Sequence, residues 1–153
     1  MKLYKNILCP VDFSESSYEA LQKAGELAIS FSARLTVMHV IYRIPPMYGI
    51  EGINPGFDVI SYEKDLGAKI QKQLEEEVAK RVGGDISPNI LIRYGDAAQQ
   101  IQATAEKEGI DLIVLATHGM TGWRHYVFGS VAQKVVQHTD RNVLFVHARK
   151  PDA

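Results

Sequence analysis

Short apolar runs rich in valine, isoleucine and leucine alternate along the chain with longer stretches in which apolar residues return every three or four positions. The first pattern is typical of strands buried on both faces of a sheet, and the second of amphipathic helices. Successive strand and helix units of this kind form parallel sheets. The pattern therefore predicts an α/β fold.

The apolar runs predict five strands, at Asn6 to Val11, Arg34 to Ile41, Asn89 to Arg93, Asp111 to Ala116 and Asn142 to His147. The helical periodicity predicts helices around Leu21 to Phe31, Leu66 to Val78, Ala97 to Lys107 and Ser130 to His138. Ser14 or Ser16 provides a hydroxyl to cap the first helix, and Gly83 stops the second.

Parallel strands joined by helices require right-handed crossovers, which produce an open sheet with helices on both faces. The first and fourth strands are the most uniformly apolar, so we expect them to lie centrally. The prediction is a single domain over residues 1–153, with a doubly wound, five-stranded parallel sheet of order 3-2-1-4-5. Ligands of such folds bind beyond the carboxyl ends of the strands at the topological switch, here between strands one and four.

The loop from Ala116 to Ser130 follows the fourth strand and reads ATHGMTGWRHYVFGS. Glycines let backbone N–H groups approach an anion, and the start of the following helix favours negative charge. The loop therefore predicts a phosphate site. The alternative is that the glycines only shape a turn and Ser130 only caps the helix, but the location at the expected switch point favours the phosphate.

Asp12 lies across the same crevice, just after the first strand in the segment CPVDFSESS. A carboxylate accepts hydrogen bonds from ribose hydroxyls and binds hard cations such as Mg²⁺. Asp12 is therefore a candidate for either role. Its alternative role is to cap the first helix, since aspartate is favoured at that position.

These features resemble the universal stress protein family over essentially the whole chain. The resemblance rests on the order of elements, the VDFS segment after the first strand, and Gly119 followed after nine residues by Gly129 and Ser130. The nucleotide-binding branch of the family carries G-x2-G-x9-G-[S/T], in which backbone amides and the final hydroxyl hold phosphates. Ala116 stands in place of the first glycine. The resemblance implies an adenine nucleotide alpha hydrolase-like fold that binds ATP, or ADP or AMP, with Mg²⁺ as an optional companion.

The resemblance also implies a set of binding residues, some around the nucleoside and some around the phosphates. In chain order they are Pro10, Val11, Asp12, Val40, Ala116, Thr117, His118, Gly119, Gly129, Ser130 and Val131. The first three border adenine and ribose, Val40 packs on adenine, and the others belong to the phosphate side. Among the remaining histidines, His39, His138 and His147 are interpreted as structural, and no histidine-based metal site is expected.

The composition narrows the range of partners. A formal charge of −1 offers no electrostatic footprint for nucleic acid, and neither a secretory segment nor a membrane span fits the sequence. We therefore expect a cytoplasmic protein with no nucleic acid or membrane partner. The single cysteine, Cys9, lies in an apolar run and is interpreted as a small buried hydrophobic residue.

The last strand, Asn142 to His147, is apolar and predicted to lie at the sheet edge, where its unpaired backbone groups invite pairing with a second copy. Such a homodimer is also the usual assembly of the family. The long irregular segment Tyr42 to Ser61 is expected to be either a flap over a neighbouring surface or a free solvated loop.

No positioned base or arginine finger is recognisable, so we expect bound ATP to be hydrolysed slowly or not at all. The favoured hypothesis is a stress-response or signalling dimer in which nucleotide sets the conformation presented to an unknown protein partner. One alternative is an interaction dimer of the branch that does not bind nucleotide, which Ala116 motivates. Others are a slow ATPase or self-phosphorylating protein and, more distantly, a flavin-binding electron carrier.

Overall fold

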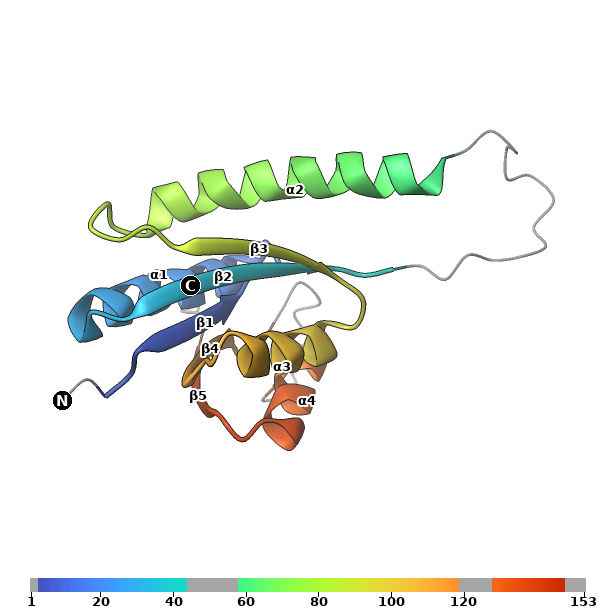
Figure 1. Cartoon of the computed structure of the whole chain (residues 1–153). Helices are drawn as coiled ribbons and strands as arrows, with labels where there is room; N and C mark the ends of the chain where they lie inside the picture. The colour runs from blue at the N-terminus through green and yellow to red at the C-terminus, as the bar shows by residue number, and fades with distance from the viewer. Residues whose placement is uncertain (1–2, 44–57, 119–127, 148–153) are drawn as a thin grey trace, which may run out of the picture.

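The computed structural model describes residues 3–43, 58–118 and 128–147. Its strands are β1 (Asn6–Pro10), β2 (Arg34–Ile41), β3 (Asn89–Tyr94), β4 (Leu112–Ala116) and β5 (Asn142–Val146). Its helices are α1 (Glu15–Phe31), α2 (Val59–Arg81), α3 (Ala97–Lys107) and α4 (Ser130–His138). The strands form one parallel sheet in the order β3-β2-β1-β4-β5 (Figure 1). This confirms the predicted order and the central place of β1, with β4 beside it.

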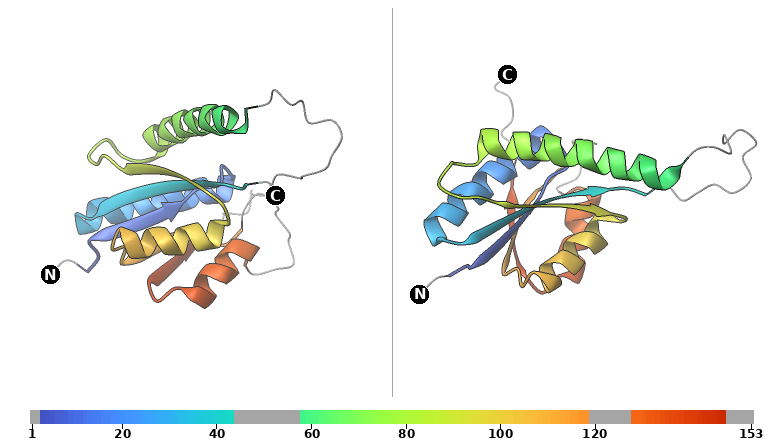
Figure 2. Two further views of the ribbon diagram at one scale, coloured as in Figure 1. Left: turned by 45° about the vertical axis from the view of Figure 1, so that its right-hand side comes forward. Right: turned by 45° about the horizontal axis from the view of Figure 1, so that its top comes forward.

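Helices cover both faces of the sheet, with α1 and α2 on one side and α3 and α4 on the other (Figures 1 and 2). Neighbouring residues of β1 point to opposite faces: Ile7 joins the core formed with α1 and α2, while Leu8 joins the core formed with α3 and α4. Full burial of each such side chain contributes about 2 kcal/mol. Among the described residues, no helix combines the length and apolar character needed to span a membrane.

Helix α2 begins at Val59, which corrects the predicted start near Leu66 and shortens the predicted irregular segment. Asp58 caps it, accepting hydrogen bonds from the backbone N–H groups of Ile60 and Ser61 at 3.1 and 3.2 Å. Periodicity missed this turn because Val59 and Ile60 are exposed and bury no apolar stripe. The choice between flap and solvated loop stays a prediction, since residues 44–57 lie outside the described residues.

Polar and ring contacts at both ends of α2 add to the packing of its Leu74 and Val78 in the core. Near its start, the hydroxyl of Tyr94 donates to the carbonyl of Glu63 at 3.0 Å, and a Cβ atom at Gly67 would lie 2.3 Å from that hydroxyl oxygen. Any other residue at position 67 would therefore displace the Tyr94 hydroxyl from this hydrogen bond. Near its end, the guanidinium of Arg81 lies 3.7 Å from the ring centroid of Tyr18 on α1.

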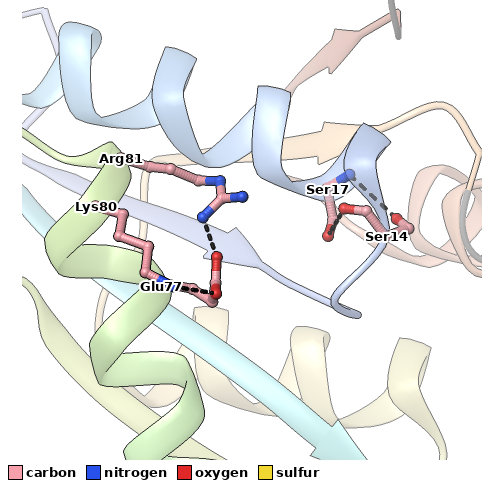
Figure 3. Close-up of polar contacts among 5 residues, drawn as sticks. All are labelled: Ser14, Ser17, Glu77, Lys80 and Arg81. Atoms are coloured by element: carbon pink, nitrogen blue, oxygen red, sulfur yellow. Dashed lines mark hydrogen bonds and ion pairs between the residues drawn. The ribbon is translucent and has the colours of Figure 1, made fainter.

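Figure 3 shows that the carboxylate of Glu77 binds both Arg81 and Lys80 on the same helix. The hydrogen bond from Lys80 and the nearby positive charges lower the pKa of Glu77. Because Arg81 is held from one side by Glu77, it is fixed in place over the Tyr18 ring. The last turns of α2 are thereby joined to the first turn of α1.

Candidate functional site

A cavity of about 300 Å³ opens at the carboxyl ends of β1, β2 and β4, where the starts of α1, α3 and α4 meet. Its location is the switch point between β1 and β4 that the strand order predicts. The lining residues are Pro10, Val11, Asp12, Ser17, Met38, His39, Val40, Ala97, Ile101, Leu115, Ala116, Thr117, His118, Gly129, Ser130, Val131 and Ala132.

Every predicted site residue that the structure describes lies in this lining. Gly119 lies outside the described residues. The structure therefore brings together the segment after β1, the end of β2, the end of β4 and the start of α4, which are far apart in the sequence. The part that each residue plays toward a ligand stays a prediction.

The start of α1 forms one wall of the cavity, and a side chain from its own segment accepts a hydrogen bond from the backbone of its first turn. Ser14 is the N-cap, one of the two predicted candidates, and its hydroxyl oxygen accepts from the N–H of Ser17 at 3.2 Å (Figure 3). Asp12 is not the cap; its carboxylate accepts hydrogen bonds from the hydroxyl and the backbone N–H of Ser14. The Ser17 hydroxyl donates to the Ser14 carbonyl at 2.8 Å and accepts from the Asp12 N–H at 3.3 Å.

The loop between β1 and α1 has a strained backbone. Phe13 has a φ of 65°, in the left-handed region that bulky residues rarely adopt. Its ring packs on His39 with centroids 4.7 Å apart, and Nδ1 of His39 lies 2.7 Å from the carbonyl oxygen of Val11. The structural role of His39 stays a prediction, since the residue makes these contacts and also lines the cavity. Strain that surrounding contacts hold in place is concentrated at functional sites.

The start of α4 forms another wall and differs from the other helix starts. Its N-cap is Gly129, which has no side chain to cap the helix, and no other side chain among the described residues makes a capping hydrogen bond there; Ser14, Asp58 and Asp96 cap α1, α2 and α3. The N–H of Gly129 donates to the carbonyl of Thr117 at 2.6 Å, which ties the helix start to the end of β4. The first turn of α4 therefore presents its N-terminal partial positive charge to the cavity without a capping side chain.

The start of α3 closes the third side. Asp96 accepts a hydrogen bond from the N–H of Gln99 at 3.0 Å, and its other carboxylate oxygen lies 3.6 Å from the ammonium of Lys134 on α4. These contacts, the backbone hydrogen bond foremost, lower the pKa of Asp96. The carboxylate thus joins α3 to α4 beside the cavity.

Several lining residues were not predicted to bind a ligand: Ser17, Met38, His39, Ala97, Ile101, Leu115 and Ala132. Their apolar or helical spacing marks most of them as core, and they are indeed buried or nearly so. A residue at the carboxyl end of a core strand or the start of a helix borders the core on one side and the cavity on the other. Such residues could have been predicted to line the cavity from their position at the end of a strand or the start of a helix.

Cys9 is fully buried next to the site, as its apolar setting predicts, and burial raises the pKa of its thiol. A thiolate is therefore disfavoured there. In the described part of the chain, no three residues of the histidine, cysteine, aspartate and glutamate types gather closely enough to hold a metal ion.

Comparison with known proteins places this geometry in context. The universal stress protein A homolog 1 of Coxiella burnetii is 33% identical over 94% of this chain and 96% of its own length. The solved structure of MJ0577 from Methanocaldococcus jannaschii superposes with a TM-score of 0.72 at 27% identity, covering 97% of this chain and 99% of that chain.

Two further solved structures contain nucleotides. A universal stress protein in complex with cAMP superposes with a TM-score of 0.66 at 19% identity, covering 94% of this chain and 97% of that one. The universal stress protein from Archaeoglobus fulgidus in complex with dAMP superposes with a TM-score of 0.57 at 18% identity, covering 95% and 98%. These two likenesses concern the fold. The model of the universal stress protein family matches residues 3–147, and the chain belongs to that family.

Proposed function

We propose that this chain binds an adenine nucleotide, ATP or ADP in particular, in the cavity at the ends of β1, β2 and β4. The observation that carries the proposal is the glycine N-cap of α4, the start of a helix that opens on the cavity without a capping side chain. Helix starts of this kind bind phosphate groups, because their backbone N–H groups and the helix dipole both favour an anion.

The opposite part of the cavity suits the nucleoside. Met38, Val40, Ile101 and Leu115 provide apolar surface from two strands and α3, as an aromatic base requires. Asp12 provides carboxylate oxygens that accept hydrogen bonds from ribose hydroxyls, and it is also the residue that would meet a Mg²⁺ ion carried by the nucleotide. Family members with bound cAMP and dAMP support an adenine nucleotide as the ligand class.

In this proposal the nucleotide sets the conformation of a homodimer in a cytoplasmic stress response, and an unidentified protein reads that conformation. The dimer forms through β5, which lies at the edge of the sheet next to β4 and exposes 37% of Leu144. An edge strand with unpaired backbone groups is suited to pair with its own copy about a two-fold axis. The cytoplasmic location and the stress response rest on membership of the family.

The test is binding of ADP and adenosine, measured by calorimetry, after mass spectrometry of any nucleotide released from freshly purified protein. We expect Gly129→Asp to weaken ADP binding at least about tenfold, because the new carboxylate caps α4 and repels phosphate, with adenosine binding unchanged. Gly129→Ala is the matched control: the φ of −69° suits alanine, and no acceptor is added. Wild-type ADP affinity in Gly129→Asp would refute the phosphate assignment.

A second candidate is an interaction dimer that binds no nucleotide. It is favoured by Ala116, whose methyl group lies in the cavity lining where the family motif has glycine. The variant Ala116→Gly separates the two. If wild type binds no nucleotide and Ala116→Gly binds ADP, the methyl group blocks the site; if both bind, the first proposal stands.

A further inference from the structure

A buried hydroxyl at the end of β4 lies between two imidazole rings. Thr117 is only 1% exposed, and its Oγ1 atom lies 3.0 Å from Nδ1 of His118 and 3.5 Å from Nδ1 of His147. The two histidines come from different places in the chain: His118 follows β4, and His147 follows β5. Threonine therefore joins two titratable rings that the sequence separates by almost thirty residues.

The backbone of Thr117 also joins the end of β4 to neighbouring elements. Its N–H donates to the carbonyl of Val146 at 3.2 Å, and its carbonyl accepts from the N–H of Gly129 at 2.6 Å. The end of β5, the end of β4 and the start of α4 thus meet at one residue. His118 lines the cavity, whereas His147 lies outside the lining and is exposed.

A threonine hydroxyl has one proton to donate and two lone pairs to accept with, while a neutral imidazole donates from one nitrogen and accepts at the other. We propose that Nδ1–H of His147 donates to the Thr117 oxygen, and that the Thr117 hydroxyl donates to Nδ1 of His118. Neutral His118 then carries its proton on Nε2, the tautomer that leaves this nitrogen as the donor toward a phosphate. His147 is a positioning residue, and this inference rests on the proposed function.

The first measurement is the tautomer of His118 by long-range ¹H–¹⁵N NMR, which needs no nucleotide. We expect the Nε2–H form in wild type and a mixture of tautomers in His147→Ala. The variant His147→Asn restores the Nε2–H form, because its side-chain amide places a donor where Nδ1 was. The same tautomer distribution in wild type and His147→Ala would overturn the relay.

The second measurement is the affinity for ADP and for adenosine. In His147→Ala we expect ADP binding to weaken by up to about fivefold, because only the fraction of His118 that keeps the Nε2–H form donates to phosphate, with adenosine binding unchanged. His147→Asn should bind ADP within about twofold of wild type by the same reasoning. A general loss of structure would weaken the binding of both ADP and adenosine, and His147→Asn would not restore it.

The matched control is His138→Ala. Nδ1 of His138 lies 2.8 Å from the carbonyl oxygen of Lys134 in the last turn of α4, away from the cavity, so its removal should leave both affinities unchanged. Equal ADP affinity in His147→Ala and wild type refutes the inference alone. Absence of ADP binding in wild type refutes the proposed function, and the phosphate role of His118 fails with it.

Discussion

The starts of α1 and α4 border the same cavity, but they differ in how the backbone N–H groups of the first helical turn are capped. At α1, Ser14 caps the helix, and Asp12 and Ser17 hold Ser14 in place. The first turn of α1 also carries Glu15, whereas that of α4 has no acidic residue and follows the N-cap Gly129. A helix start closed by side chains serves as a rigid wall, and one without a capping side chain is suited to receive an anion.

The largest expected effect comes from breaking the closed start of α1. Ser17→Ala removes a buried hydroxyl that serves both Asp12 and Ser14, and it should lower the free energy of unfolding by about 2 kcal/mol because the Asp12 N–H loses its partner. Urea unfolding measures this. Ser30→Ala is the matched control: its hydroxyl also binds a helix carbonyl in α1, but it is exposed, and the change should stay within about 0.5 kcal/mol.

A smaller effect is expected from the cap itself. Ser14→Ala should lower the free energy of unfolding by about 1 kcal/mol, the usual cost of losing an N-cap oxygen. At the equivalent position of α4, Gly129→Ser should raise it by a few tenths of a kcal/mol, since serine adds a cap that the helix lacks. Thermal or urea unfolding tests both. If Ser14→Ala and Gly129→Ser lowered the free energy of unfolding by the same amount, the two helix starts would not differ in capping.

The smallest expected effect concerns the charged cap of α3. Because hydrogen bonding lowers the pKa of Asp96 in the folded state, its ionised form stabilises the fold above the unfolded pKa of about 3.9, and this contribution is lost as the pH falls through the folded value. Asp96 is largely solvated, so the difference between wild type and Asp96→Asn should be a few tenths of a kcal/mol at pH 7. Unfolding at pH 7 and pH 3 measures it.

We expect wild type to have the higher free energy of unfolding at pH 7, and the difference from Asp96→Asn to disappear at pH 3. Asparagine keeps the capping oxygen and removes only the charge. A gap that is the same at both pH values would indicate that the cap acts through its hydrogen bond alone.

Local pattern was sufficient for most of the secondary structure, and it failed where an element makes few tertiary contacts. The strand β2 and the helices α3 and α4 begin and end where the sequence predicts. The first turns of α2 were missed because Ile60 is 80% exposed, so no buried stripe marks them, and only the Asp58 cap signals the start. A cap is a weaker local signal than a periodic apolar face.

The sequence by itself determined the strands, the two buried faces and the location of the cavity at the switch between β1 and β4. Successive residues of a strand, such as Ile7 and Leu8, point to opposite faces of the sheet, so a short apolar run is enough to predict burial on both faces. The connection rules for parallel sheets then allow only a few strand orders. Only the tertiary structure decided which side chains meet there. The contact of Thr117 with His147 depends on how β4 and β5 end side by side, which no local pattern encodes.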